Sequence, residues 1–315
     1  MMRVGVIFPG QGSQVVGMGV EVARAFPMAM ECFNAAKTVL GYDLFAMCEH
    51  GPEEKLRETR YAQPAIFVTN VALYMAIGRA LDPVASAGHS FGEFCSLQIA
   101  DSMSFEAALS LVNERGLAMH RAAQLAPGAM AAVLGASPEK LRDTVAAVVR
   151  DGGGRVQLAN FNAPGQIVIS GDADAVRIAG ERALVDGAKR VVPLNVAGAW
   201  HSQLMEPAQT DFAKHIRNAS IVMPRFPVIS NVDARAYADV ATIKENLVKS
   251  VTHEVRWHDT SVALVALGLD LIVEFGASPV LAPMLKRIDN APKAMSVGDR
   301  AGVEKLQAML ATASV

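Results

Sequence analysis

The sequence predicts an α/β fold, in which helices cover both faces of a mainly parallel sheet and a smaller unit is inserted. Three observations support this prediction. Short apolar runs at residues 3–8 and 83–88 end in glycine turns and lead into helical patterns. In the middle of the chain the order becomes strand, helix, strand, strand, helix, strand. The length of 315 residues is large for one simple core, which also favours an insertion.

The larger unit is expected to combine residues 1–126 with residues 197–315. Apolar runs bounded by glycine or proline predict buried strands, and amphipathic periodicity predicts helices. The helix over 62–81 is expected to carry Pro64 in its first turn, and Ser104 is expected to cap the next one. The predicted segments are strands at 3–8, 83–88, 226–232 and 269–276, and helices within 17–41, 62–81 and 104–124.

The inserted unit is expected to span residues 127–196. A strand at 129–135 precedes a helix that Ser137 caps and that has Pro138 at its first position. Two strands joined by the turn Asn162–Gly165 follow, and then a helix and a last strand. This βαββαβ order predicts a ferredoxin-like subdomain.

Composition excludes several classes of protein. Hydrophobic residues make up 51% of the chain, charged residues 19%, and the net charge is −2. Because no basic stripe with interleaved aromatic side chains is present, we expect no nucleic-acid partner. The three cysteines lack metal-ligand spacing and suit a reducing compartment. The N-terminal apolar run is too short to cross a membrane, so we expect a soluble cytoplasmic protein.

The segment Gly-His-Ser-Phe-Gly at residues 88–92 is the first candidate for chemistry. It fits the G-x-S-x-G nucleophile elbow, in which two glycines let a strand turn sharply into a helix and expose the serine hydroxyl. An ordinary strand–helix turn with a capping serine is an equally good interpretation of this motif alone. Ser90 is therefore a candidate nucleophile that needs a base.

Among seven histidines, His201 is a good candidate for that base. It follows the last predicted strand of the insertion, in a loop at the junction of the two units. His89 adjoins Ser90, but neighbouring side chains at such a turn point apart, so His89 is poorly placed. A buried structural histidine is the alternative interpretation of His201.

Six segments occur in order along the chain: FPGQGSQ (8–14), AGHSFGEF (87–94), NERGLAM (113–119), NFNAPGQIVISG (160–171), GAWHSQLMEPA (198–208) and VRWHDTSV (255–262). Together they resemble the malonyl-CoA:acyl carrier protein transacylases, and the resemblance extends from residue 3 to about residue 290. The family includes enzymes of fatty-acid synthesis and acyltransferases of polyketide synthases, and it implies an α/β-hydrolase-like large subdomain.

The resemblance implies roles for the matching residues. Ser90 would carry the acyl group, and His201 would act as base and then as acid. The backbone N–H groups of Gln11 and Phe91 would bind the oxyanion. Arg115 would hold the free carboxylate of malonate, which a planar guanidinium can do with two parallel bonds. Without the resemblance, Arg115 would be interpreted as a surface arginine paired with an acid.

The sequence departs from the usual family pattern at several positions. Phe91 replaces an aliphatic residue, Trp200 replaces phenylalanine, and the 274–281 loop differs in sequence. Trp200 should narrow the space for a substituent on the α-carbon of the acyl group. Ser250 replaces glutamine, but the implied role, orienting His201, belongs to the backbone carbonyl and survives. The resemblance also makes these residues candidates for lining the cleft: Gln63, Asn160, Asn162, Gln166 and Trp200.

The resemblance implies transfer of malonyl from malonyl-CoA to the phosphopantetheine thiol of an acyl carrier protein, in fatty-acid or polyketide synthesis. No metal or cofactor is expected, and a monomer is expected. Four alternatives stay open: an acyl hydrolase, transfer of another acyl group, a non-catalytic docking module for carrier proteins, and a generic serine esterase. The basic residues Lys189, Arg190, Lys286 and Arg287 could meet an acidic partner, although a solvated face is the better interpretation.

Overall fold

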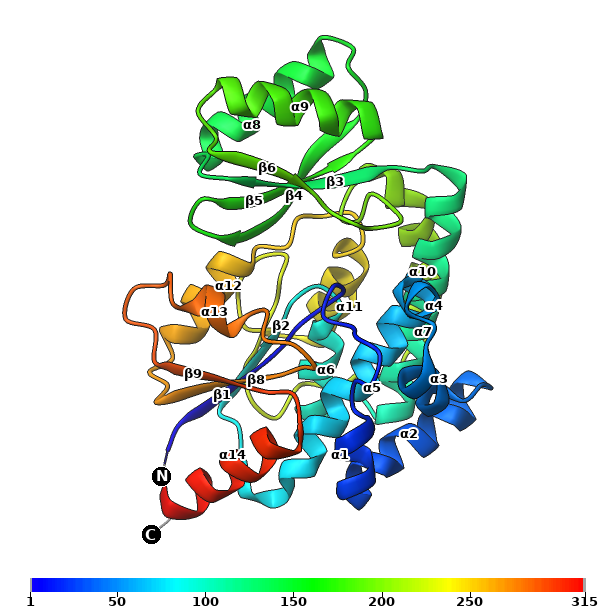
Figure 1. Ribbon diagram of the computed structural model, residues 1–315, viewed down its shortest axis with the longest axis vertical. Coiled ribbons are helices and arrows are strands. Elements are labelled where there is room, and N and C mark those ends of the chain that lie inside the picture. Colours follow the sequence, from blue (N-terminus) through cyan, green and yellow to red (C-terminus); the bar gives the residue numbers. More distant parts are fainter. Residues whose placement is uncertain (1, 314–315) are drawn as a thin grey trace.

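The computed structural model describes residues 2–313, and its strands form two separate sheets, one above the other (Figure 1). The larger sheet has the strand order β7-β2-β1-β8-β9, and every neighbouring pair in it is parallel. The predicted α/β fold class is confirmed. The strands of this sheet are β1 (Val4–Phe8), β2 (Ala85–Gly88), β7 (Val228–Ile229), β8 (Leu271–Phe275) and β9 (Lys293–Val297).

Helices pack on both faces of the larger sheet. Val6 and Phe8 of β1 belong to the core on one face, whereas Ile7 belongs to the core on the other, as the alternation of side chains along a strand requires. The helices outside the small sheet are α1 (Val20–Ala25), α2 (Pro27–Leu40), α3 (Leu44–His50), α4 (Glu53–Arg57), α5 (Thr59–Ile77), α6 (Gly92–Ile99), α7 (Phe105–Leu125), α10 (Glu206–Asn218), α11 (Val240–Lys249), α12 (Trp257–Val265), α13 (Ala282–Leu285) and α14 (Arg300–Ala313), with 3-10 turns at Gly78–Ala80 and Gln203–Met205.

The smaller sheet is antiparallel, with the order β4-β5-β3-β6. Helices α8 and α9 cover its upper face, and its lower face is directed toward the larger sheet (Figure 1). Strand order and the βαββαβ sequence of elements match the ferredoxin-like unit expected from the sequence. The elements are β3 (Ala129–Leu134), α8 (Pro138–Arg150), β4 (Val156–Ala163), β5 (Gln166–Gly171), α9 (Ala173–Val185) and β6 (Arg190–Pro193).

The two sheets are joined through the edge strand β4. Its backbone pairs with Val255, which accepts a hydrogen bond from the N–H of Phe161 at 2.9 Å and donates one to the carbonyl of Ala159 at 2.8 Å. This pairing fixes one wall of the space between the sheets. The unit boundaries at residues 126–127 and 196–197 stay a prediction.

Helix ends agree with the predicted caps at two places, but one prediction was wrong. The side chains of Ser104 and Ser137 each accept a backbone N–H at the start of their helix, at 3.2 Å. Helix α5, however, begins at Thr59, so Pro64 lies inside it rather than in its first turn. Thr59 is buried against the rest of the protein, and this packing extends the helix beyond the segment that the proline rule indicates.

Candidate active site

Ser90 lies in a sharp turn between β2 and α6, with a positive φ of 55°. The turn needs both flanking glycines. A Cβ on Gly88 would lie 2.0 Å from the backbone of Gly92, and a Cβ on Gly92 would lie 2.5 Å from the carbonyl oxygen of Phe8. Backbone atoms cannot move aside as side chains do, so this close packing explains the glycines at these positions. The turn has the geometry of a nucleophile elbow.

The hydroxyl of Ser90 lies 2.9 Å from Nε2 of His201. The other ring nitrogen, Nδ1, lies 2.8 Å from the carbonyl oxygen of Ser250 and 3.2 Å from that of His253. Because a carbonyl can only accept a hydrogen bond, Nδ1 carries the proton and Nε2 presents its lone pair to Ser90. The pair therefore has the tautomer that a base needs, and no carboxylate contributes to it.

His201 is held in the neutral form. Burial, the positive charge of Arg115 and the neighbouring His89, in that order of size, together lower its pKa to about 3. His89 itself is directed away from Ser90. Its Nε2 lies 3.0 Å from Oδ1 of Asn162 and 3.4 Å from Nδ2 of Asn160, as expected for adjacent side chains that point apart.

Arg115 is almost completely buried, with 1% of its surface exposed, and it reaches the hydroxyl of Ser90. Its Nη2 lies 3.3 Å from Oγ of Ser90, and its Nη1 donates to Oε1 of Gln63 at 2.9 Å. Among the described residues, no group accepts a hydrogen bond from its Nε. Burial lowers the pKa of Arg115 to about 10, which leaves it charged at neutral pH. A buried guanidinium without a full set of acceptors can receive a carboxylate.

A chain of hydrogen bonds connects Arg115 to the loop that contains Gln11. Gln63 accepts from Arg115 and donates to the hydroxyl of Thr59 at 3.2 Å, and Thr59 donates to Oε1 of Gln11 at 2.7 Å. The side chain of Gln11 is thereby fixed. Within residues 2–313, the structure records no acceptor for the backbone N–H of Gln11 or of Phe91. Both residues line the cavity that contains Ser90, and their role as oxyanion donors stays a prediction.

The cavity around Ser90 has a volume of about 90 Å³, which suits a short acyl group. The structure places most of the candidate residues in its wall. Gln166 and Asn162 are not among them: Gln166 accepts a hydrogen bond from Arg287 at 3.3 Å, and Asn162 contacts His89. The wall consists of Gln11, Gln63, His89, Ser90, Phe91, Arg115, Met119, Met130, Asn160, Leu194, Val196, Trp200 and His201.

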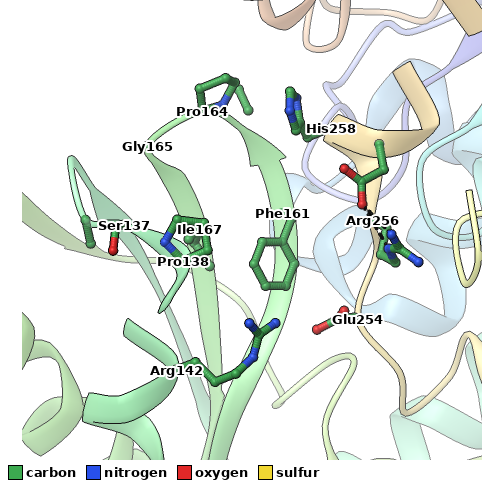
Figure 2. Close-up of a pocket in the computed structure, with 13 residues that line it drawn as sticks. Ser137, Pro138, Arg142, Phe161, Pro164, Gly165, Ile167, Glu254, Arg256 and His258 are labelled. Carbon is green, nitrogen blue, oxygen red and sulfur yellow. Dashed lines mark hydrogen bonds and ion pairs between the residues drawn. The ribbon is translucent and has the colours of Figure 1, made fainter. Parts of the chain in front are cut away.

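A larger cavity of about 520 Å³ lies on the other side of β4, and Figure 2 shows its lining. Phe161 points into this cavity, below Pro164 and above the guanidinium of Arg142, whereas its neighbours Asn160 and Asn162 contact His89. In the opposite wall, Arg256 forms an ion pair with Asp259. The serine in this lining, Ser137, caps α8 by accepting the N–H of Lys140, whereas Ser90 contacts the ring of His201, so the smaller cavity is the candidate active site.

Two polar side chains near the site, the buried Asn231 and the half-buried Gln157, were missed by the sequence analysis. Asn231 contacts the backbone of the elbow on both sides of His89, at Gly88 and at Ser90. Gln157 donates to the carbonyl of His201 at 3.2 Å and to that of Thr252 at 3.1 Å, and so holds the histidine loop against the segment that orients its ring. Neither lies near Ser90 in sequence, and only the tertiary structure brings them there.

Comparisons with known proteins agree with this geometry. Residues 6–313 match the family described as acyl transferase domain. The chain is 38% identical over 305 residues to the malonyl CoA-acyl carrier protein transacylase of Bacillus subtilis (strain 168), covering 96% of each chain. The chain belongs to this transacylase family.

Solved structures extend the match to the whole fold of the transacylases. An acyl carrier protein S-malonyltransferase from Vibrio cholerae is 36% identical, with a TM-score of 0.91, over 96% of this chain and 99% of that one. A malonyl-transacylase in complex with its type II PKS acyl-carrier protein is 36% identical, with a TM-score of 0.92, over 98% and 99% of the chains. The resemblance predicted from six sequence segments is confirmed.

No helix in the described part of the chain has the length and apolar character needed to span a bilayer. Among residues 2–313, no group of three or more His, Cys, Asp or Glu side chains is arranged to hold a metal ion. The expectations of no metal and no cofactor stay predictions.

Proposed function

We propose that this transacylase moves a malonyl group from malonyl-CoA to the phosphopantetheine thiol of an acyl carrier protein, through a malonyl ester on Ser90. The observation that carries the proposal is the position of Arg115, whose Nη2 lies 3.3 Å from the same hydroxyl that His201 contacts at 2.9 Å. A nucleophile, a base and a buried cation for a carboxylate therefore meet at one point. The names of its relatives support the same substrate and partner.

The first half-reaction follows from the hydrogen bonds. His201 takes the proton of Ser90 at Nε2 as the serine oxygen attacks the thioester carbon, and the Nδ1–H bond to the Ser250 carbonyl stabilises the imidazolium that forms. The backbone N–H groups of Gln11 and Phe91 hold the oxyanion. His201 then returns the proton to the sulfur of the departing CoA, which leaves as a thiol. Malonyl-Ser90 remains.

The second half-reaction repeats these steps with the carrier-protein thiol as nucleophile. His201 takes the thiol proton and returns it to the Ser90 oxygen, so the enzyme is regenerated. During the interval Arg115 anchors the carboxylate and keeps the acyl chain in a small, enclosed cavity, which limits the access of water. An acyl group without a carboxylate would leave the buried guanidinium unpaired and would be rejected.

The proposal includes no metal or cofactor, since the chain itself supplies nucleophile, base, oxyanion donors and carboxylate site. We also propose a cytoplasmic monomer, and the three cysteines, which are buried and unpaired, are consistent with a reducing compartment. Both fatty-acid and polyketide synthesis use this transfer, and the geometry supports either pathway equally.

The direct test is the intact mass of the protein after exposure to malonyl-CoA, and again after addition of a pantetheinylated carrier protein. We expect a malonyl adduct in the wild type that disappears in Ser90→Ala and moves to the carrier protein. Arg115→Ala should lower the rate of malonyl labelling about 100-fold, because two charge-assisted bonds are lost. The preference for malonyl-CoA over acetyl-CoA should fall by the same factor. Arg121→Ala is the control, since Arg121 lies on the same helix but pairs with Asp211 at the surface.

The possible outcomes separate the alternatives. If the adduct decays to free malonate at the same rate with and without carrier protein, the protein is a hydrolase. If no adduct forms with malonyl-CoA or acetyl-CoA, the acyl group is different or the protein does not catalyse transfer. Equal labelling of Arg115→Ala and the wild type would contradict the proposed carboxylate site.

A further inference from the structure

Asn231 forms a bridge across the nucleophile elbow. It is completely buried and follows β7, the edge strand that pairs with β2. Its Oδ1 accepts the backbone N–H of Ser90 at 2.6 Å, and its Nδ2 donates to the carbonyl oxygen of Gly88 at 2.6 Å. One carboxamide thus binds the residue before His89 and the residue after it, and closes a ring around the turn.

The backbone of Asn231 is anchored on two sides. Its carbonyl accepts the N–H of Arg256 at 3.0 Å, in the segment that precedes α12. Its own N–H lies 3.4 Å from Oε2 of Glu93, in the first turn of α6, and the hydroxyl of Tyr237 donates to the other oxygen of Glu93. The amide is therefore held in place by elements other than the elbow, and can act on the elbow as a fixed support.

The elbow needs such a support because Ser90 adopts a conformation that is unfavourable for a residue with a side chain. Its φ of 55° lies in the left-handed region. This conformation directs Oγ to His201, and the next residue, Phe91, lines the cavity. A small rotation of the turn would move both the nucleophile and one oxyanion donor away from the thioester carbon.

We propose that Asn231 is a positioning residue for acyl transfer, whose carboxamide holds Ser90 in its strained conformation and so aligns the hydroxyl with His201 and the Phe91 N–H with the oxyanion. The inference rests on the proposed malonyl transfer for its substrate. Asn231 touches neither His201 nor Arg115, so its effect is on the rate of acylation rather than on the binding of the malonyl carboxylate.

The first test measures single-turnover acylation by malonyl-CoA in Asn231→Ala. We expect the limiting rate to fall about 100-fold, as for a misplacement of reacting groups, while the half-saturating concentration of malonyl-CoA changes less than about threefold. Asn246→Ala is the matched control. Asn246 is 5% exposed and donates to Ser230 beside the same turn, but it does not contact the elbow. It should keep the wild-type limiting rate.

The second test uses Asn231→Asp, which has the same shape. An ionised carboxylate still accepts from Ser90 but repels the Gly88 carbonyl, whereas a protonated carboxyl can donate to that carbonyl and accept from Ser90. We therefore expect the acylation rate of Asn231→Asp, relative to the wild type, to rise as the pH is lowered from about 8 to about 5. The titratable and charged groups around this turn are common to both proteins: Glu93, Tyr237 and Asp233 on the side of Asn231, and His89, His201 and Arg115 on the side of the cavity.

Two results would overturn the inference: an unchanged limiting rate in Asn231→Ala, or equal losses in Asn231→Ala and Asn246→Ala. Absence of a relative gain at low pH in Asn231→Asp would also contradict it. If the wild type forms no malonyl adduct, that result contradicts the proposed malonyl transfer but leaves the positioning role of Asn231 open to test. Labelling of Ser90 by a fluorophosphonate, which needs an activated serine but no malonyl recognition, then replaces acylation as the readout for the same variants.

Discussion

His201 illustrates how single residues acquire their chemistry from their surroundings. An imidazole at the surface would be partly protonated near neutral pH, but burial, Arg115 and His89 together keep this one neutral. The backbone carbonyl of Ser250 selects the tautomer, so the change from glutamine to serine at this position is compatible with the role. In the proposed mechanism, side-chain identity matters at Ser90 and Arg115, whereas backbone position matters at Ser250, Gln11 and Phe91.

The neutral state of His201 leads to a prediction about pH. Because its pKa is lowered to about 3 in the free protein, the base stays unprotonated as the pH falls through the usual range of histidine. We expect kcat/KM for acylation by malonyl-CoA, which reports the free enzyme, to show no loss with a midpoint near pH ~6.5. Bound malonate compensates the charge of Arg115, which raises the pKa of His201 in the complex. As the pH falls, the limiting rate should therefore decrease at a higher pH than kcat/KM does.

The measurement is the initial rate of adduct formation across this pH range. Glu93→Gln is the control, because burial raises the pKa of Glu93 to about 7 and its titration would fall in the same window. A loss of kcat/KM with a midpoint near pH ~6.5 in both proteins would show that His201 titrates as an ordinary histidine.

Trp200 carries a second prediction at the scale of the residue. Its indole is 5% exposed and forms part of the wall of the acyl cavity. Trp200→Phe should enlarge the cavity and raise the rate of labelling by methylmalonyl-CoA, relative to malonyl-CoA, about tenfold. Competition between the two donors measures this ratio. Trp257→Phe is the control, since Trp257 is fully buried but lies outside the cavity wall. An equal increase of the ratio in both variants would mean that a general loosening of the core causes it.

At the scale of elements, the elbow depends on the close approach of three segments. Strand β2, helix α6 and the end of β1 meet at Gly88 and Gly92, where a side chain would overlap backbone atoms. The pattern of two glycines around a serine was therefore readable from sequence. The support by Asn231 was not, since its side chain is 141 residues from Ser90 along the chain.

Gly92→Ala tests this packing. The new Cβ would lie 2.5 Å from the carbonyl oxygen of Phe8, so β1 and α6 must separate. We expect a loss of about 1–3 kcal/mol in the free energy of unfolding and a large loss of acylation, measured by denaturant titration and by adduct formation. Gly302→Ala, in α14, is the control, because the nearest atoms to its Cβ would be Oδ1 of Asp299 at 3.2 Å and Cα of Val297 at 3.3 Å, both farther than the 2.5 Å at Gly92. A Gly92→Ala protein with wild-type stability would contradict the packing argument.

At the scale of the whole molecule, the site is assembled from both units. Ser90, Arg115 and Gln11 come from the larger one, while Met130, Asn160 and Leu194 of the smaller one complete the cavity. The backbone of β4 pairs with Val255 of the larger unit beside this cavity. The antiparallel sheet thus acts as a cover over the carboxyl ends of the parallel strands β1, β2 and β7, where a ligand site is expected in an open α/β sheet.

The sequence by itself determined the alternation of strands and helices, the βαββαβ insertion, the caps at Ser104 and Ser137, and the glycine-flanked serine, because each depends on neighbours within a few residues. Only the tertiary structure decided four other features. They are the start of α5 before Pro64, the second carbonyl at His201, the hydrogen-bond chain from Gln11 through Thr59 and Gln63 to Arg115, and the bridge made by Asn231. These contacts join residues far apart in the chain. Local propensity and spacing carry no information about such pairs, since the pairs exist only once the sheets and helices have packed.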